Sequence, residues 1–418
     1  MSDFAGPAPA GESEWTRGWR IVLGCALASG TGIVLLFFTF NLMVLPLATE
    51  LGVSRGEIGA IQALVVTGAI GSVVIGRVAD IWGFRATYLA CAAATVAAML
   101  IIARYGETLA HMAIGVAVLG FLGVGTAALV TTRPVNAHFH RYRGRALGLV
   151  ATGVSITAIL APLVLAPVIA AHGWRGGFAG LAALMALVGM PAVWLIVPRG
   201  AGAAVAHSGG KRRGDWSFLK TRDFRLMGAA VVAMGLATTG FVGQLSPIVQ
   251  AEGFDASVGA LAVSAFAAGQ FIGRLGGGWL LDTFRPQTVA LVFTIVPGAG
   301  FVLLLATDQT LWAALLAAGM IGLQQGVELD LFAYFVARRF PLAAYGTVYG
   351  ALLGTAWIGN AAGIVGVGMI HDSTGSYDLA QAIGMAALTV GALLVWAVHL
   401  PPLGPRPMPE GPEGSVLP

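Results

Sequence analysis

Charged residues are scarce in this sequence. Only 10% of its 418 residues are Asp, Glu, Lys or Arg, whereas soluble domains carry about one quarter. Hydrophobic residues make up 57%, and the mean hydropathy is +0.84. This composition excludes a soluble globular domain and indicates an integral membrane protein.

Cysteine and the familiar catalytic motifs are also scarce or absent. Cys25 and Cys91 each lie in an apolar run, which predicts packed thiols rather than disulfides. The sequence has no P-loop, HExxH or GxSxG pattern, so it offers no support for an enzyme, an ATP-driven pump, a cofactor or a metal centre. His138 and His140 stand beside arginines and are interpreted as interfacial rather than metal-binding. Residues 1–15 lack the basic start and apolar core of a signal peptide, so we expect the first helix to be retained.

Twelve apolar runs are long enough to cross about 30 Å of hydrocarbon. They are expected, with ends uncertain by about three residues, at 20–47, 57–79, 86–104, 109–136, 145–171, 176–197, 225–250, 257–281, 287–306, 310–337, 343–371 and 379–400. The expected fold is therefore all-α, with twelve transmembrane helices in two pseudo-symmetric six-helix bundles. The corresponding segments are a cytoplasmic N-terminal tail (1–17), a first bundle (18–197), a cytoplasmic linker (198–224), a second bundle (225–400) and a disordered cytoplasmic tail (401–418).

The basic residues fix the orientation of these helices. With a cytoplasmic N-terminus, 18 of the 23 Lys and Arg residues fall in inside segments and three fall outside. Short basic loops stay in the cytoplasm, so both termini are placed inside. The "KRRG" of residues 211–214 is read as part of this bias rather than as a nucleic-acid site. We expect a multi-pass protein of a bacterial cytoplasmic membrane that contacts lipid, binds no nucleic acid and functions as a monomer.

Glycine is abundant, with 60 residues, about twice the usual share. Small residues let membrane helices approach closely, particularly when they recur every four positions. Gly269, Gly273 and Gly277 have this spacing, which predicts a tightly packed helix face.

A short motif occurs near the same place in both halves. "GRVADIWGFR" begins at Gly76 and "GGWLLDTFR" begins at Gly277. Here the chain resembles the major facilitator superfamily, whose loop between helices 2 and 3 reads Gly-x-x-x-Asp-x-x-Gly-x-Arg. The resemblance implies a latch in which the Asp and Arg hold the bundles together on the cytoplasmic side when the protein opens outward; the alternative is a solvated turn. The candidate gating residues are Gly76, Asp80, Gly83 and Arg85, and, in a second copy without the second glycine, Gly278, Asp282 and Arg285.

Four charged residues remain inside the expected helices: Arg133, Arg274, Glu328 and Asp330. From the loop charges that follow, three lie about 12 Å above the cytoplasmic boundary and Glu328 about 15 Å above it. An isolated charge there costs at least about 2.5 kcal/mol, so we expect the two cations to pair with the two acids. Such pairs can be purely structural, but charges at the midplane between repeats usually mark a substrate or proton path.

Helical spacing assigns different roles to the two acids. Glu328 shares a face with Gln324 and Gln325, which favours a wet cavity, whereas Asp330 shares its face with Gly326, which favours close helix contact. Glu328 is therefore the first candidate for proton coupling and Asp330 the second.

On another helix, Gln270 precedes Arg274 by one turn. An amide beside a forked cation suits a carboxylate ligand.

The chain also resembles, along most of its length, the monocarboxylate-transporter-like branch and its oxalate:formate-type relatives. The segments concerned are "FHRYRGRALGLVATG", "GQFIGRLGGGWLLD", "GVELDLFAYFVARRF" and "HDSTGSY". In those relatives an arginine in a "GR" dipeptide binds the substrate carboxylate, which implies this role for Arg274. A lysine that some members carry in helix 1 or 11 has no counterpart, and Asn360 is among the nearest polar features.

The candidate substrate-binding residues are thus Arg274, Gln270, Arg133 and Asn360. The expected function is secondary active transport of a small organic anion, a monocarboxylate, with a proton. The alternatives are an exporter of amphipathic compounds, an anion exchanger and, more remotely, a solute sensor that does not transport.

Overall fold

The computed structural model describes residues 13–53, 55–201, 216–251, 253–254, 256–306 and 310–400. Within these ranges the regular structure is entirely helical, and its helices occupy the twelve expected spans. Eight helical segments are individually long and apolar enough to cross a membrane. The termini and most of the expected linker lie outside the described residues.

The first bundle contains the spans expected from 20 to 197. Its main helices are α1 (Glu14–Gly30), α2 (Val34–Thr39), α3 (Asn41–Leu51), α4 (Arg55–Ala63), α5 (Gly68–Tyr105), α6 (Leu109–Gly123), α7 (Ala128–His138) and α8 (Arg143–Leu184), followed by π-helical turns to Ile196. Two helices fold back on themselves at a glycine with positive φ, Gly83 (φ 78°) in α5 and Gly173 (φ 62°) in α8. Because L side chains rarely adopt this conformation, glycine marks each turn between spans.

The second bundle has one long helix per span. These are α10 (Arg222–Ala251), α11 (Ala256–Thr283), α12 (Pro286–Ala306), α13 (Leu311–Arg339), α14 (Tyr345–Thr374) and α15 (Asp378–Trp396). Without a glycine at the second copy of the motif, α11 ends at Thr283 and α12 starts at Pro286, a residue suited to the first helical position.

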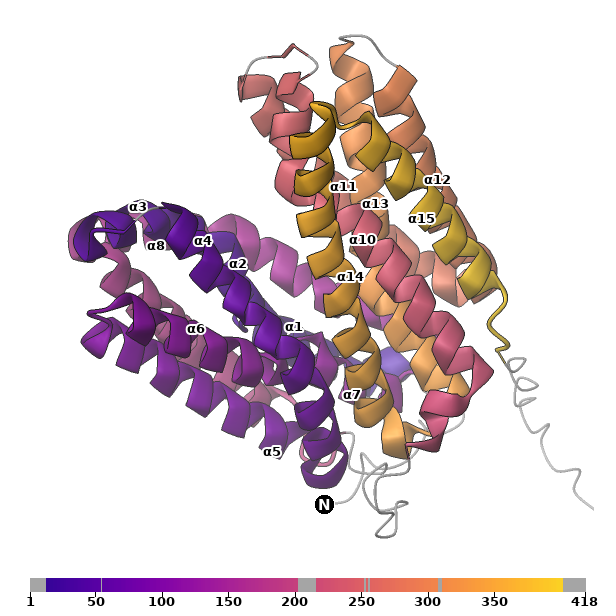
Figure 1. The fold of residues 1–418 in the computed structure, drawn as a ribbon. Coiled ribbons are helices and arrows are strands. Elements are labelled where there is room, and N and C mark those ends of the chain that lie inside the picture. The colour runs from indigo at the N-terminus through magenta and orange to yellow at the C-terminus, as the bar shows by residue number, and fades with distance from the viewer. Residues whose placement is uncertain are drawn as a thin grey trace, which may run out of the picture.

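The two bundles meet at one end of the molecule, which the basic loops predict to be the cytoplasmic side. Figure 1 shows them in contact near α7 and the lower end of α14 and diverging away from this contact. One hydrophobic core there contains residues of both bundles, such as Leu147 and Leu281, while a second core fills the outer part of the first bundle. The protein is therefore closed on the side of the N-terminus.

Glycines form the contact between bundles in two equivalent seams. In the first seam, between α5 and α14, a Cβ on Gly76 would lie 2.1 Å from the carbonyl oxygen of Gly346. In the second seam, between α8 and α11, a Cβ on Gly278 would lie 2.4 Å from the carbonyl oxygen of Gly144. Real Cβ atoms do not approach so closely, so each motif glycine brings backbone against backbone across the interface.

The predicted glycine face of α11 is confirmed. Added Cβ atoms on Gly269 and Gly273 would lie 2.0 and 2.3 Å from carbonyl oxygens of α13, and one on Gly277 would meet the Val327 side chain at 2.2 Å. Gly326 does the same from the α13 side, 2.2 Å from the Gln270 carbonyl oxygen. This tight packing of α11 on α13 lets Asp330 interact electrostatically with Arg274.

Candidate functional site

Asp80 joins the two bundles at the first seam. Its carboxylate accepts hydrogen bonds from the backbone N–H groups of Gly346 (2.9 Å) and Thr347 (2.7 Å) and from the Thr347 hydroxyl (2.5 Å). These groups belong to the first turn of α14, where the helix dipole favours an anion. The acid thus caps a helix of the opposite bundle.

Asp282 makes the equivalent contact at the second seam. It accepts hydrogen bonds from the backbone N–H groups of Gly144 (2.7 Å) and Arg145 (2.9 Å) at the start of α8, and the Arg145 Nε lies 4.0 Å away. Asp80 and Asp282, here called the latch acids, therefore each accept hydrogen bonds from the start of a helix in the opposite bundle, at equivalent positions of the two halves.

The motif arginines do not cross the interface in this structure. Arg85 donates to the carbonyl oxygens of Val193 (2.8 Å) and Val197 (3.0 Å), at the end of the sixth span of its own bundle. Arg285 is exposed in the turn between α11 and α12. The resemblance implied Asp and Arg acting together across the interface, whereas here only the acids reach the other bundle and Arg85 braces helices within one bundle.

The expected pairing of Arg133 with a midplane acid is wrong. Its Nη1 forms an ion pair of 2.8 Å with Asp80 and also contacts the Ala79 carbonyl oxygen. The Arg133 side chain is only 2% exposed, and its Nε and Nη2 have no hydrogen-bond partner. Sequence reasoning counted Asp80 as a loop residue and so left it out of the pairing, although helices 2 and 4 are neighbours in one bundle.

Arg274 bridges the bundles at the midplane. Its Nη1 donates to the Ser155 hydroxyl (2.7 Å) and to the Ala151 carbonyl oxygen (3.1 Å), both on α8 of the first bundle. Asp330, on α13, attracts the guanidinium electrostatically, and its own Oδ2 lacks a hydrogen-bond partner. The hydrogen bonds that hold Arg274 thus come from neutral oxygens of α8, while Asp330 interacts with it electrostatically without forming an ion pair.

Glu328 lies on the same helix with a different neighbour. It is buried and accepts a hydrogen bond of 3.2 Å from the Gln324 amide, as the helical spacing predicted. Among the described residues no cation is within ion-pair distance of it, and the side-chain oxygens of Gln324 and Gln325 have no partner. With Arg133 paired to Asp80, Arg274 is the one cation left, among the four charged residues predicted at this depth, for the two acids Asp330 and Glu328.

A buried tyrosine forms a contact that sequence reasoning missed. The Tyr345 hydroxyl, on α14, is 3.0 Å from both the Thr132 hydroxyl and the Asn136 amide nitrogen, on α7. Tyr349, one turn further, donates to the Leu329 carbonyl oxygen (3.0 Å). Polar residues on both sides of Arg133 were the available signal, because Thr132 and Asn136 are one helical turn apart in an apolar span.

Asn360, another predicted substrate ligand, contacts α10 in this structure. Its Oδ1 accepts a hydrogen bond of 3.0 Å from the Thr239 hydroxyl and lies where a Cβ on Gly235 would sit, so it packs against α10 within the second bundle. Of the predicted site residues, the structure thus shows an electrostatic interaction between Arg274 and Asp330, a contact of Glu328 with Gln324, and Asn360 at the interface of α14 with α10.

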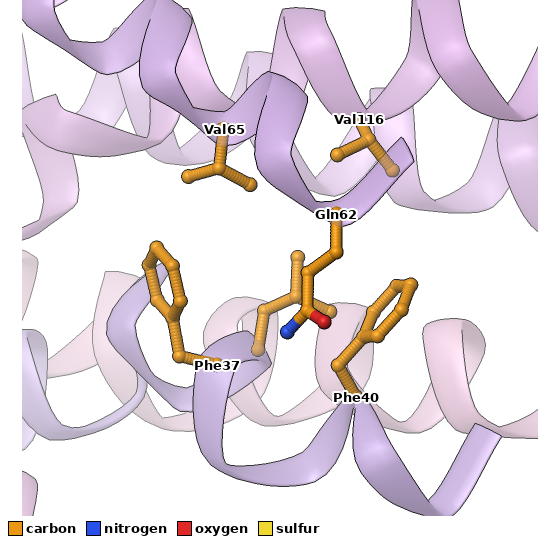
Figure 2. A pocket seen from close by; sticks show the side chains of 6 residues that line it. Phe37, Phe40, Gln62, Val65 and Val116 are labelled. Carbon is orange, nitrogen blue, oxygen red and sulfur yellow. The ribbon is translucent and has the colours of Figure 1, made fainter. Parts of the chain in front are cut away.

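A separate small pocket lies in the outer part of the first bundle. Figure 2 shows the Gln62 amide between Phe37 and Phe40, with valines on the far side. The lining is Leu36, Phe37, Phe40, Gln62, Val65 and Val116. Since it contains one amide and no charge, this pocket has none of the chemistry that the midplane residues offer.

Comparison with known proteins agrees with this architecture. Residues 26–364 match the family model of the Major Facilitator Superfamily. The chain belongs to this superfamily. Its members are transporters and not enzymes, and the apolar helices make this one an integral, multi-pass membrane protein.

Individual transporters resemble the chain over different lengths. It is 24% identical to mouse Monocarboxylate transporter 11, covering 97% of this chain and 91% of that protein. It is 28% identical to Arabidopsis thaliana "Probable anion transporter 4, chloroplastic", but over only 36% of this chain and 28% of that protein.

Solved structures of the superfamily share the fold. The transporter FucP in its outward conformation has a TM-score of 0.73 at 17% identity, covering 90% of this chain and 97% of its own. The human organic anion transporter MFSD10 has a TM-score of 0.71 at 15% identity, covering 92% and 100%. At these identities the likeness concerns the fold alone.

Proposed function

We propose that this protein carries a small organic anion, a monocarboxylate, together with a proton, by alternating access across a bacterial cytoplasmic membrane, and that it works as a monomer. The observation that supports this most directly is the environment of Arg274. Its fork is bound by a hydroxyl and a carbonyl oxygen from the opposite bundle, and a carboxylate can replace such neutral acceptors with a stronger bidentate contact.

A second support is the position of this arginine between the bundles. A ligand bound to Arg274 competes with Ser155 and Ala151 of α8 and so weakens a contact across the second seam. Binding at a site shared by two rocking bundles is how such transporters link substrate to conformation. Gln270, half-buried one turn away, is the proposed second ligand.

The charges at the midplane favour a coupled proton. Arg274 offsets one of the two acids, Asp330 and Glu328, so the ionised set already sums to −1. Adding a monocarboxylate brings the sum to −2, at a cost of several kcal/mol in this environment. A proton on Glu328, which has no cation beside it, offsets the added charge. Anion and proton then favour each other's binding, and this coupling is reciprocal. Asp330 is the second candidate for the proton.

The relatives support the substrate class. Those from mouse and rat are named monocarboxylate transporters, and a solved neighbour is named an organic anion transporter. These names come from proteins of low identity, so the direct evidence for this chain is the cluster of charges.

The test is uptake into proteoliposomes. We expect a panel of labelled carboxylates to identify a substrate whose accumulation rises with an imposed pH gradient. Accumulation without any effect of the gradient would indicate exchange, and transport of amphipathic cations alone would indicate an exporter of amphipathic compounds.

Arg274→Lys tests the binding role. It keeps the charge but loses the fork, and we expect affinity to fall about 10- to 100-fold, the loss of one charged hydrogen bond. Arg104→Lys, at an exposed site on the outer end of α5, is the control and should bind normally. Unchanged affinity in Arg274→Lys with normal expression contradicts the assignment.

A further inference from the structure

The loop between α7 and α8 receives a second carboxylate besides the latch acid. Glu14, in the first turn of α1, accepts hydrogen bonds from the backbone N–H groups of His140 (3.1 Å), Arg141 (3.1 Å) and Tyr142 (3.1 Å). Both of its oxygens take part. Few carboxylates bind three successive amides, and here they fix the backbone conformation of the loop.

The start of α1 is docked on this loop in other ways too. The Trp15 ring lies 4.9 Å from the Phe139 ring, and the Glu14 carbonyl oxygen is 3.1 Å from the His138 Nε2. Gly18 makes room for Phe139, since a Cβ there would lie 2.2 Å from its ring. Phe139 is fully buried as a result. The Glu14 contact is therefore part of a packed junction within one bundle, which a rocking motion does not separate.

The next amides of the chain donate to an acid of the other bundle. Asp282 takes the N–H groups of Gly144 and Arg145, so two carboxylates together bind five of the six amides from 140 to 145. One of them, Glu14, moves with the loop. The other, Asp282, must leave when the cytoplasmic side opens. The Glu14 contact, which lies within one bundle, thus fixes the backbone next to the amides that Asp282 binds from the other bundle.

The second half repeats this arrangement with different partners. Asp223, in the first turn of α10, binds Arg339 at the end of α13 and accepts the His399 N–H at 3.2 Å. A few residues beyond Arg339, the first amides of α14 receive Asp80. In each bundle, an acid at the start of the first span holds the segment that leads to the latch.

We propose that Glu14 is a positioning residue for alternating access: it orders residues 140–142 so that the amides of Gly144 and Arg145 are presented to Asp282. Loss of Glu14 weakens the second seam and shifts the protein away from the outward-facing state. The opposing effect is repulsion, because Glu14 and Asp282 are near enough for their charges to interact. If repulsion dominated, loss of Glu14 would strengthen the seam, so the two effects have opposite signs.

The experiment measures the conformational equilibrium without substrate, so that it stands apart from the proposed substrate and proton. Spin labels at two exposed outer positions, Tyr105 and Trp312, report the outer separation of the bundles by double electron–electron resonance. We expect Glu14→Ala to lower the ratio of outward-facing to inward-facing molecules about fivefold, the effect of losing a typical helix cap. Thr16→Ala, at an exposed neighbouring site, is the control and should leave the ratio unchanged.

A double-mutant cycle makes the test specific. In an Asp282→Asn background the second seam is already weakened. Glu14→Ala should then have little further effect on the ratio of outward-facing to inward-facing molecules. An equal effect in both backgrounds shows that Glu14 does not act through Asp282, and an increased outward-facing fraction shows that repulsion dominates; either result overturns the proposal. If Glu14→Ala does not fold, two milder variants replace it: Glu14→Asp, which keeps the charge, and Glu14→Gln, which keeps one acceptor oxygen. Both are expected to shift the conformational equilibrium in the same direction by a smaller amount.

Discussion

Replacing Asp80 with Asn affects two contacts differently: the hydrogen bonds to Thr347 across the first seam and the ion pair with Arg133 within the first bundle. Asn keeps Oδ1, the atom that receives Gly346 and Arg133, but its amide nitrogen cannot accept from the two Thr347 groups now bound to Oδ2. The bonds to Thr347 exist only while the cytoplasmic side is closed. The ion pair with Arg133 lies within one bundle and persists when that side opens.

The contact with Thr347 determines the effect on the conformational equilibrium, and the contact with Arg133 determines the effect on stability. Charged hydrogen bonds contribute about 1.5 to 3 kcal/mol each, and hydration of the carboxylate in the open state offsets part of this. A net loss of about 2 kcal/mol changes the conformational equilibrium roughly 30-fold toward the inward-facing state. The introduced asparagine still accepts a hydrogen bond from Arg133 but carries no charge, and leaving the buried guanidinium without an opposite charge costs about 3 kcal/mol in every state. The melting temperature should therefore fall as well.

Two further variants separate the effects. Thr347→Val removes only the hydroxyl bond and should shift the equilibrium about fivefold without loss of stability. Adding Arg133→Gln to Asp80→Asn removes the unpaired charge and should restore the melting temperature while leaving the equilibrium shifted.

The assay combines label distances, equilibrium substrate binding and turnover for Asp80→Asn. We expect slower transport with nearly normal binding. The latch assignment is wrong if binding collapses while the turnover of bound substrate does not change, or if the population of outward-facing molecules is unaffected.

Three further outcomes follow from contacts described above. Glu328→Gln, which mimics the protonated acid, should retain substrate exchange but lose accumulation driven by a pH gradient; full gradient-driven uptake would move the proton to another group. Gly278→Ala should shift the equilibrium toward the inward-facing state, because its Cβ meets a carbonyl oxygen at 2.4 Å only in the closed seam, whereas Gly276→Ala, with no atom within 4 Å, should not. The hydrogen bond from Arg175 holds the pKa of Glu50 below its ordinary value of 4.5. The stability that this contact contributes is therefore complete above pH 4.5 and is lost as the pH falls through the lower pKa of the folded state. The melting temperatures at pH 7 and pH 3 should thus differ less in Glu50→Gln than in the wild type.

The fold was largely predictable because each helix carries its own signal. Runs of about 20 apolar residues and the basic loops located the spans, and the motif glycine located the turn at Gly83. The stripe from Gly269 to Gly277 likewise identified the face of α11 that contacts α13, since helical periodicity is a local property.

The partners of individual charges were less predictable. Depth along a helix predicted a common level for Arg274 and Asp330, which do interact electrostatically, but depth does not say which helix faces which. Arg133 was therefore matched with the wrong acids. The contact of Asn360 with Thr239 was likewise not predicted, and its role as a substrate ligand stays a prediction. The role of Tyr345 depends on two helices that are far apart in sequence and meet only when the bundles close.

The glycine seams also bear on leakage of ions. Where the backbones of Gly76 and Gly346, or of Gly278 and Gly144, touch directly, the space between helices is too small for a water molecule, which needs about 10 to 15 Å³ and polar partners. A chain of waters cannot cross such a contact, so protons cannot pass along it by hopping. The small size of these residues thus keeps water out of the seams, and a larger side chain at a seam would be expected to increase the leakage of ions through the protein.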